Sequence, residues 1–119
     1  MDIIVNTDLI AKAALAYFDN APKHIGLGVL DWVRDTQGAW NPEHNSGDSF
    51  DLMVKLNLNV FFVNGVAHAM ESESDASVEF KVYHNGNPKA AMRMAILKVA
   101  ASIGTYIAEA AEENLQSNV

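Results

Sequence analysis

Four histidines are the residues of this chain most able to bind a metal ion: His24, His44, His68 and His84. No two of them have the His-x-x-x-His or Glu-x-x-His spacing that places metal ligands on one face of a helix. A metal site would therefore have to be assembled by tertiary folding alone. We expect neither a bound metal nor any other cofactor.

Two groups of carboxylates could in principle act as a general acid and base. Glu43, Asp48 and Asp51 gather around a polar loop, and Glu71, Glu73 and Asp75 gather in a turn. Catalytic carboxylates need a desolvating pocket that shifts their pKa values, whereas these segments are polar. The calcium-loop pattern and the Gly-x-Ser-x-Gly elbow are absent, and the chain has no cysteine nucleophile. We therefore expect the chain not to be an enzyme.

The net charge of −7 arises from fifteen acidic against eight basic residues, and the basic residues are scattered. Direct contact with nucleic-acid phosphates is disfavoured, because it depends on concentrated cationic charge. An acidic surface suits solubility or docking onto a basic surface of another protein. The candidate partner-binding residues are Trp40, Glu43, Asp48, Asp51, Glu71, Glu73 and Asp75. Trp32 and Trp40 are either core residues or partner anchors.

A chain of 119 residues suits one domain, spanning residues 1–119. The absence of cysteine fits a reducing compartment. The first residues lack a signal-peptide pattern, and no uninterrupted apolar run reaches the roughly 18 residues of a membrane span. We expect a cytoplasmic protein that does not span a membrane.

The N-terminal half predicts two short helices separated by irregular chain. Asn6-Thr7-Asp8 supplies N-cap candidates for a helix that stops near residues 19–22. Residues 25–33 fit a helix or an extended segment, and residues 35–49 predict a loop pinned by Trp40. Ser46 or Asp48 is expected to cap the second helix. Its predicted apolar face comprises Phe50, Leu52, Met53 and Leu56.

Residues 56–63 alternate between apolar and other side chains and lead directly into Asn64-Gly65, the strongest short hairpin signal. A two-residue turn pairs Val63 with Val66 and places Val60, Phe62, Ala67 and Ala69 on the predicted core face. The period-two pattern of residues 78–82 predicts a third antiparallel strand. On the opposite sheet face, Phe61, His68 and Tyr83 form an alternative ligand pocket.

Asn87-Pro88 predicts the start of a long C-terminal helix, with Asn87 as N-cap and Pro88 at the first helical position. Its predicted apolar stripe comprises Met92, Ile96, Val99, Ile103, Tyr106, Ile107 and Ala110. Gly104 marks either a close contact or an early stop. The predicted fold class is α+β, in which a small antiparallel sheet packs against helices. Free sheet edges make a homodimer reasonable.

The order of these parts resembles a family of phage proteins. The chain is similar to the phage ABA sandwich domain and to ninX-type accessory proteins of tailed phages in four features that follow one another. These are Trp40-Asn41-Pro42, Asp48-Ser49 at the start of a short helix, a strand pair, and Asn87-Pro88-Lys89-Ala90-Ala91. The similarity covers residues 7–110. It implies a layered fold, a phage or prophage origin and expression inside a bacterial host, and it implies no catalytic residue.

Three functional hypotheses follow. The first is a non-enzymatic phage accessory protein that binds a host protein, such as a component of a defence system, through its acidic surface. The second is a protein that binds or sequesters a small ligand, with a structural phage protein of no catalytic activity as a further alternative, and the third is a metal-dependent hydrolase. The residues favour them in that order.

Overall fold

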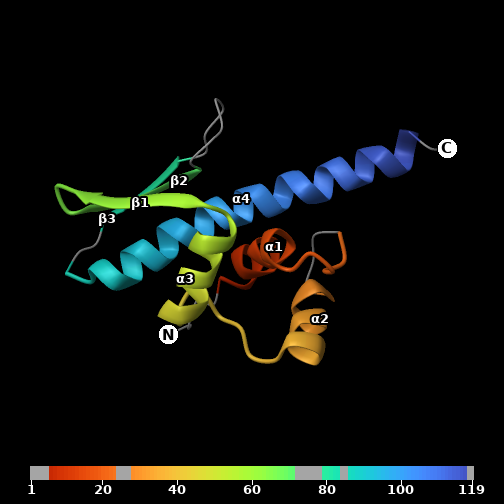
Figure 1. Cartoon of the computed structure of the whole chain (residues 1–119), viewed down its shortest axis with the longest axis horizontal. Helices are drawn as coiled ribbons and strands as arrows, with labels where there is room; N and C mark the ends of the chain where they lie inside the picture. The colour runs from red at the N-terminus through yellow and green to blue at the C-terminus, as the bar shows by residue number, and fades with distance from the viewer. Residues whose placement is uncertain (1–5, 24–27, 72–78, 84–85, 118–119) are drawn as a thin grey trace.

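The long helix α4 (Pro88–Ser117) is the element on which the sheet and α1 pack (Figure 1). The structure is a computed structural model that describes residues 6–23, 28–71, 79–83 and 86–117. The preceding elements are α1 (Thr7–Tyr17), α2 (Gly28–Gln37), α3 (Ser46–Lys55), β1 (Leu58–Val63), β2 (Val66–Glu71) and β3 (Glu79–Tyr83). The fold is α+β, as predicted, with an antiparallel sheet and a long C-terminal helix.

The hairpin between β1 and β2 has the predicted register. Val63 pairs with Val66, and Phe61 pairs with His68. Asn64 and Gly65 have φ values of 50° and 77°, the left-handed conformation that a type I′ turn requires at both central positions. Strand β3 pairs antiparallel with β2 and gives the strand order β1-β2-β3.

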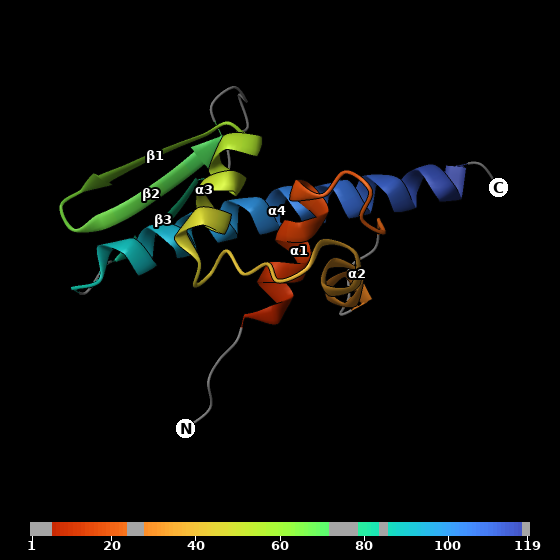
Figure 2. The same cartoon turned by 60° about the horizontal axis from the view of Figure 1, so that its bottom comes forward.

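Helix α4 covers one face of the sheet, and no described helix lies on the other face (Figure 2). On the covered face Ala67 and Ala69 are fully buried, and Val60 packs against the same core. Phe62, predicted to share this face's core, is instead 49% exposed. The physical reason is that α4 lies mainly against β2 and β3, so that the edge strand β1 extends beyond it.

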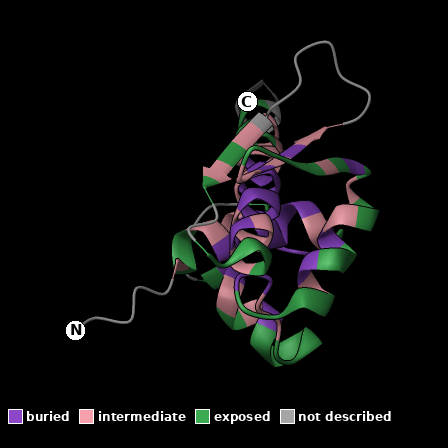
Figure 3. Ribbon diagram, turned by 90° about the vertical axis from the view of Figure 1, so that its left-hand side faces the viewer, coloured by how far each residue is buried: buried purple, intermediate pink, exposed green. Residues whose placement is uncertain are grey.

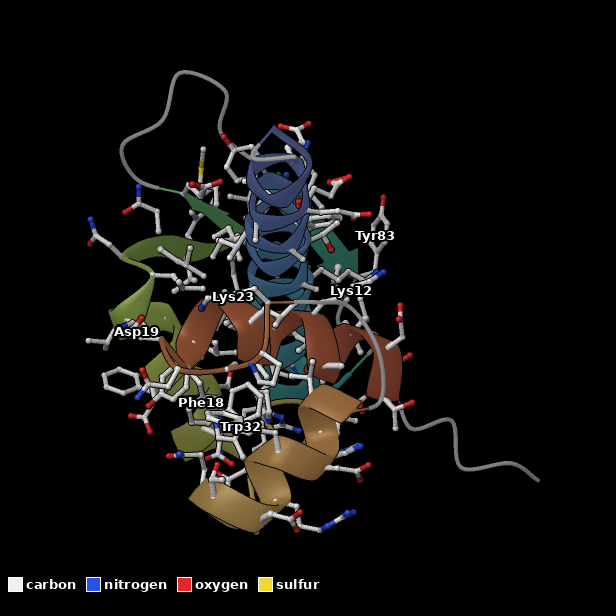
Figure 4. The ribbon with its side chains drawn as sticks, turned by 90° about the vertical axis from the view of Figure 1, so that its right-hand side faces the viewer. Lys12, Phe18, Asp19, Lys23, Trp32 and Tyr83 are labelled. Carbon is white, nitrogen blue, oxygen red and sulfur yellow. The ribbon has the colours of Figure 1, made fainter. Side chains whose placement is uncertain are left out.

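Helix α1 crosses α4 on small residues (Figure 4). Ala11, Ala14 and Leu15 of α1 are buried in one cluster with Ala108 of α4. At Gly104 a Cβ atom would lie only 1.7 Å from the carbonyl oxygen of Lys12. Gly104 is therefore a close-contact point between two backbones. In Figure 3 the buried residues gather in the middle of the fold and the exposed residues lie around the outside.

The start of α4 agrees with the sequence, whereas its predicted apolar stripe is only partly correct. The Ala90 amide donates to Asn87 Oδ1 at 3.1 Å, which confirms the N-cap. Ile96 and Val99 are buried, but Tyr106 is 73% exposed. Its inclusion in the stripe was wrong because this part of α4 packs on α1 through Gly104 and Ala108, and Tyr106 lies on the opposite side of the helix.

The segment between α1 and α3 also departs from expectation. Residues 28–33 belong to α2, which continues to Gln37, so that the predicted loop begins at Gly38 and not at Asp35. Residues 25–27 lie outside the described residues. The N-cap of α3 is Asn45, whose side chain accepts a hydrogen bond from the Asp48 amide at 2.9 Å. Asn45 precedes both predicted caps, Ser46 and Asp48.

Among the described residues, α4 is the one helix that is long and apolar enough to cross a membrane, over Pro88–Glu113. Buried core helices of soluble proteins have the same length and composition, and 44% of the relevant window is buried inside the fold. In this fold the helix supplies much of the core.

Candidate partner-binding groove

A groove of about 590 Å³ lies where the end of α1 meets α2 and α3. We call it the aromatic groove. It is lined by Tyr17, Phe18, Asp19, Asn20, Trp32, Gln37, Phe50, Asp51, Val54 and Lys55. Its volume is within the range of roughly 300–1,000 Å³ that is typical of binding sites. Figure 4 shows Phe18, Asp19 and Trp32 on the same side of the molecule.

The inner wall of the groove is a set of interlocking rings at the end of α1. The ring of Phe18 meets Trp32 edge to face, with centroids 5.8 Å apart, and meets Trp40 in the same way at 5.0 Å. Tyr17 stacks on Trp40 at 5.5 Å. Offset and edge-to-face ring pairs are the stable arrangements of aromatic side chains. The wall is therefore held by contacts among its own rings.

The two tryptophans have different positions relative to this wall. Trp32 is half-buried and lines the groove. Trp40 is also half-buried but stands behind Tyr17 and Phe18, and its indole Nε1 is buried without a hydrogen-bond partner among the described residues. Trp40 supports the wall from behind, whereas Trp32 offers part of its surface to an occupant.

Phe50 and Val54 form the outer lip of the groove, one helical turn apart on α3. They are 59% and 61% exposed, whereas Leu52 on the same helix is fully buried. The prediction that Phe50 faces the core together with Leu52 was therefore wrong. Leu52 points to the core, and Met53 and Leu56 of the predicted face pack against it, because α4 and the sheet lie on that side of α3.

Carboxylates outnumber ammonium groups around the groove. Asp19 pairs with Lys55, with Nζ 3.1 Å from Oδ2, whereas exposed Asp51 makes no ion pair with any described residue. Burial raises the pKa of Tyr17 above its ordinary value, and the nearby charges of Asp51 and Asp48 raise the same pKa further. Lys55 opposes this shift. The field of both carboxylates thus reaches the inner wall.

The structure does not bring the predicted partner-binding residues together in one site. Asp51 lines the groove. Asp48 is half-buried in the first turn of α3, and its Oδ2 accepts a hydrogen bond from the Asn41 amide at 2.9 Å. Glu71 lies at the end of β2, where it pairs with Leu58 across the sheet. Glu73 and Asp75 lie outside the described residues.

Glu43 is buried, with 8% of its surface exposed, and is used within the fold. Its carboxylate accepts hydrogen bonds from the side chain and the backbone amide of Asn6, the residue that precedes α1. Its carbonyl oxygen accepts a hydrogen bond from Arg93 Nε of α4 at 2.8 Å. Glu43 therefore joins the loop before α3 to α1 and α4, and it presents no carboxylate to a partner.

The alternative ligand pocket is only partly assembled. The rings of Phe61 and His68 stack on the uncovered sheet face, with centroids 4.6 Å apart and planes 10° from parallel. Tyr83 pairs with Val66 in the neighbouring row, and it is 73% exposed. Two of the three residues thus contact each other, and the third extends into solvent.

Within the described part of the chain, no group of three or more histidine, aspartate or glutamate side chains could hold a metal ion. Of the four histidines, His44 lies beside Glu43, with Nε2 3.4 Å from Oε1, and His68 lies on the sheet. His24 and His84 lie outside the described residues.

Sequence patterns did not single out most of the groove. The sequence predicts that Phe50 faces the core, and it indicates no site at Tyr17 or Phe18. One signal could have suggested the site, because Tyr17-Phe18 ends a helix directly before the polar pair Asp19-Asn20. Tyr and Trp rings are common in interfaces, so aromatic residues beside a polar helix end were candidates for a surface site.

Comparison with known proteins identified no relative of this chain. No family model matches it, and no curated protein and no solved structure shows significant similarity to it.

Proposed function

We propose that the chain is a non-enzymatic binding protein that docks a segment of another protein in the aromatic groove. The observation that carries the proposal is the combination of exposed Phe50 and Val54 with an aromatic wall beside them. Docking sites typically place aromatic and aliphatic anchors in a concave surface with a polar rim. The aromatic groove has both features.

The charge of the groove indicates the sign of the partner. Asp19 and Asp51 line it against the single ammonium group of Lys55, and Asp48 adds a further negative charge behind Tyr17. The whole chain carries a net charge of −7. Opposite charge steers encounter and suppresses wrong partners, so that a basic surface is the complementary one.

We further propose that the protein is a phage or prophage accessory protein that acts in the cytoplasm of a bacterial host. Its partner is then a host protein, such as a component of a defence system. The support for this part is the similarity of the Trp40-Asn41-Pro42 and Asn87-Pro88 segments to phage accessory proteins. The groove itself supports a protein partner of basic character and does not identify that partner.

Affinity enrichment from a lysate of the bacterial host tests the proposal if it compares matched variants. Phe50→Ser removes an exposed anchor from the groove, and Tyr106→Ser removes a more exposed ring from α4, away from the groove. Both positions are exposed, so that both variants should fold. Loss of a central aromatic anchor commonly weakens binding by about 2 kcal/mol or more.

We expect the wild type and Tyr106→Ser to retain the same partner, and Phe50→Ser to lose at least about nine tenths of it, since each 1.4 kcal/mol is a factor of ten in affinity. Equal recovery of every bound protein by the two variants would contradict docking in the groove. The absence of any specifically retained protein would also contradict it.

A further inference from the structure

The aromatic groove has the chemistry to select one particular side chain of its partner. Resting on the proposed function, we propose that the docked segment inserts an arginine whose guanidinium group pairs with Asp51 and lies against the rings of Phe18 and Trp32. Apolar residues beside this arginine then contact Phe50 and Val54.

A cationic anchor follows from the charges that line the groove. Lys55 already pairs with Asp19 at 3.1 Å, which leaves Asp51 as the exposed carboxylate with no ion-pair partner among the described residues. Lys23 lies nearby but donates to the Asp19 carbonyl oxygen at 2.9 Å and does not line the groove. An entering cation would thus find one carboxylate available and would not need to displace an existing pair.

The aromatic wall favours arginine over lysine. Phe18 and Trp32 meet at an interplanar angle of 70°, so that each ring can present part of its face or edge to the groove. A guanidinium group is planar, more weakly hydrated than an ammonium group, and can stack on a ring while it forms two parallel hydrogen bonds to a carboxylate. A lysine ammonium group would keep more of its hydration and make fewer of these contacts.

The spacing on α3 indicates what flanks the arginine. Phe50 and Val54 project from the same face of α3 one turn apart, and Asp51, three residues before Val54, lines the groove beside them. A residue that reaches Asp51 therefore has exposed apolar side chains next to it. A segment in which apolar residues flank one arginine fits this surface best.

Three synthetic pentapeptides test this assignment: acetyl-Ala-Leu-Arg-Leu-Ala-amide and its counterparts with lysine or citrulline in the central position. Citrulline keeps the shape of arginine without its charge. Binding to the ¹⁵N-labelled full chain is followed by two-dimensional NMR, in which the Trp32 indole and the Asp51 amide report on the groove. Asp51→Asn removes the available carboxylate, and Glu109→Gln, at an exposed position of α4, is the matched control.

We expect the arginine peptide to shift the groove resonances and to bind about tenfold more tightly than the citrulline peptide, with lysine between them. Asp51→Asn should remove most of the arginine preference and leave citrulline binding unchanged, whereas Glu109→Gln should change neither. The arginine preference should weaken as salt is added.

Equal affinity for arginine and citrulline peptides, or an arginine preference that Asp51→Asn leaves undiminished, would overturn the assignment. Absence of any peptide-induced shift in the groove would overturn it as well. These outcomes are distinct from those of the enrichment experiment. If Phe50→Ser loses the partner while all three peptides bind equally, docking in the groove still holds and only the arginine assignment fails.

Discussion

The crossing of α1 and α4 allows one substitution to be worked out in detail, namely Gly104→Ala. In an exposed helix this change stabilises by about 1 kcal/mol, because alanine is the better helix former. Here the new Cβ atom would lie 1.7 Å from the Lys12 carbonyl oxygen and 2.7 Å from the Lys12 carbonyl carbon. Both atoms belong to the backbone, so that no side-chain rotation can relieve the clash.

Ordinary contacts of a Cβ atom begin near 3.4 Å, so that the two helices must separate locally by more than an ångström. That movement would loosen the packing of Ala11, Ala14 and Leu15, all of which are buried at or near this contact. Overpacking a core costs about 1–3 kcal/mol and occasionally more, and a backbone clash belongs at the upper end. After the gain in helix propensity, we expect a net loss of about 2 kcal/mol in the free energy of unfolding.

Urea unfolding followed by circular dichroism measures this free energy. Tyr106→Ala is the control on the same helix, since Tyr106 is exposed and its removal should change stability by less than about 0.5 kcal/mol. If Gly104→Ala proved as stable as the wild type or more so, the backbones of α1 and α4 could not pass as closely as described.

Three further predictions concern a cap, a buried carboxylate and a phenol. Asn87→Ala should lower the free energy of unfolding, measured by urea unfolding, by about 1 kcal/mol, because the Ala90 amide loses its acceptor. An unchanged midpoint of the urea transition would contradict the cap. Glu43→Ala should lower the free energy of unfolding by about 1–3 kcal/mol, because it leaves the Asn6 side chain and amide without their acceptor. His44→Ala, at the exposed neighbouring position, should lower it much less. Equal losses in the two variants would contradict a structural role for Glu43. The raised pKa of Tyr17 means that the folded state keeps the phenol proton where the unfolded chain has lost it, so stability should fall as the pH rises above about 10. This decline should be smaller in Tyr17→Phe when unfolding is measured across that range, and identical declines in both proteins would be evidence against the shift.

The sequence predicted the features that depend on residues close together in the chain. Asn64-Gly65 determines the register of its hairpin because a type I′ turn needs two left-handed residues at adjacent positions. Asn87 could be predicted as a cap because its acceptor serves an amide three residues away. Such interactions need no knowledge of what packs elsewhere.

The features that were missed depend on which side of a helix has a neighbour. Phe50 and Leu52 are both apolar, yet only Leu52 is buried against α4 and the sheet. Likewise, Tyr106 fits the periodicity of α4, but Gly104 sets the side on which α1 crosses. Periodicity identifies an apolar face, and only the tertiary arrangement shows how far along the helix that face is covered.

The aromatic groove could not be read from the sequence for the same reason. Its residues come from the end of α1, from α2 and from α3, up to 38 positions apart between Tyr17 and Lys55. Of the partner-binding residues that the charge pattern suggested, Asp51 lines the groove and Glu43 is buried. Sequence alone indicated the negative sign of the surface but not the aromatic wall behind it.

Site-specific photo-cross-linking tests docking in the groove most directly. The photoreactive residue p-benzoylphenylalanine replaces Phe50 at the lip of the groove in one variant and Tyr106 on α4 in another, and both are irradiated inside the host cell. We predict that the probe at position 50 forms a covalent adduct with a basic segment of a host protein and that the probe at position 106 does not. Adducts from position 106 alone, or none from position 50, would contradict the groove as the docking surface.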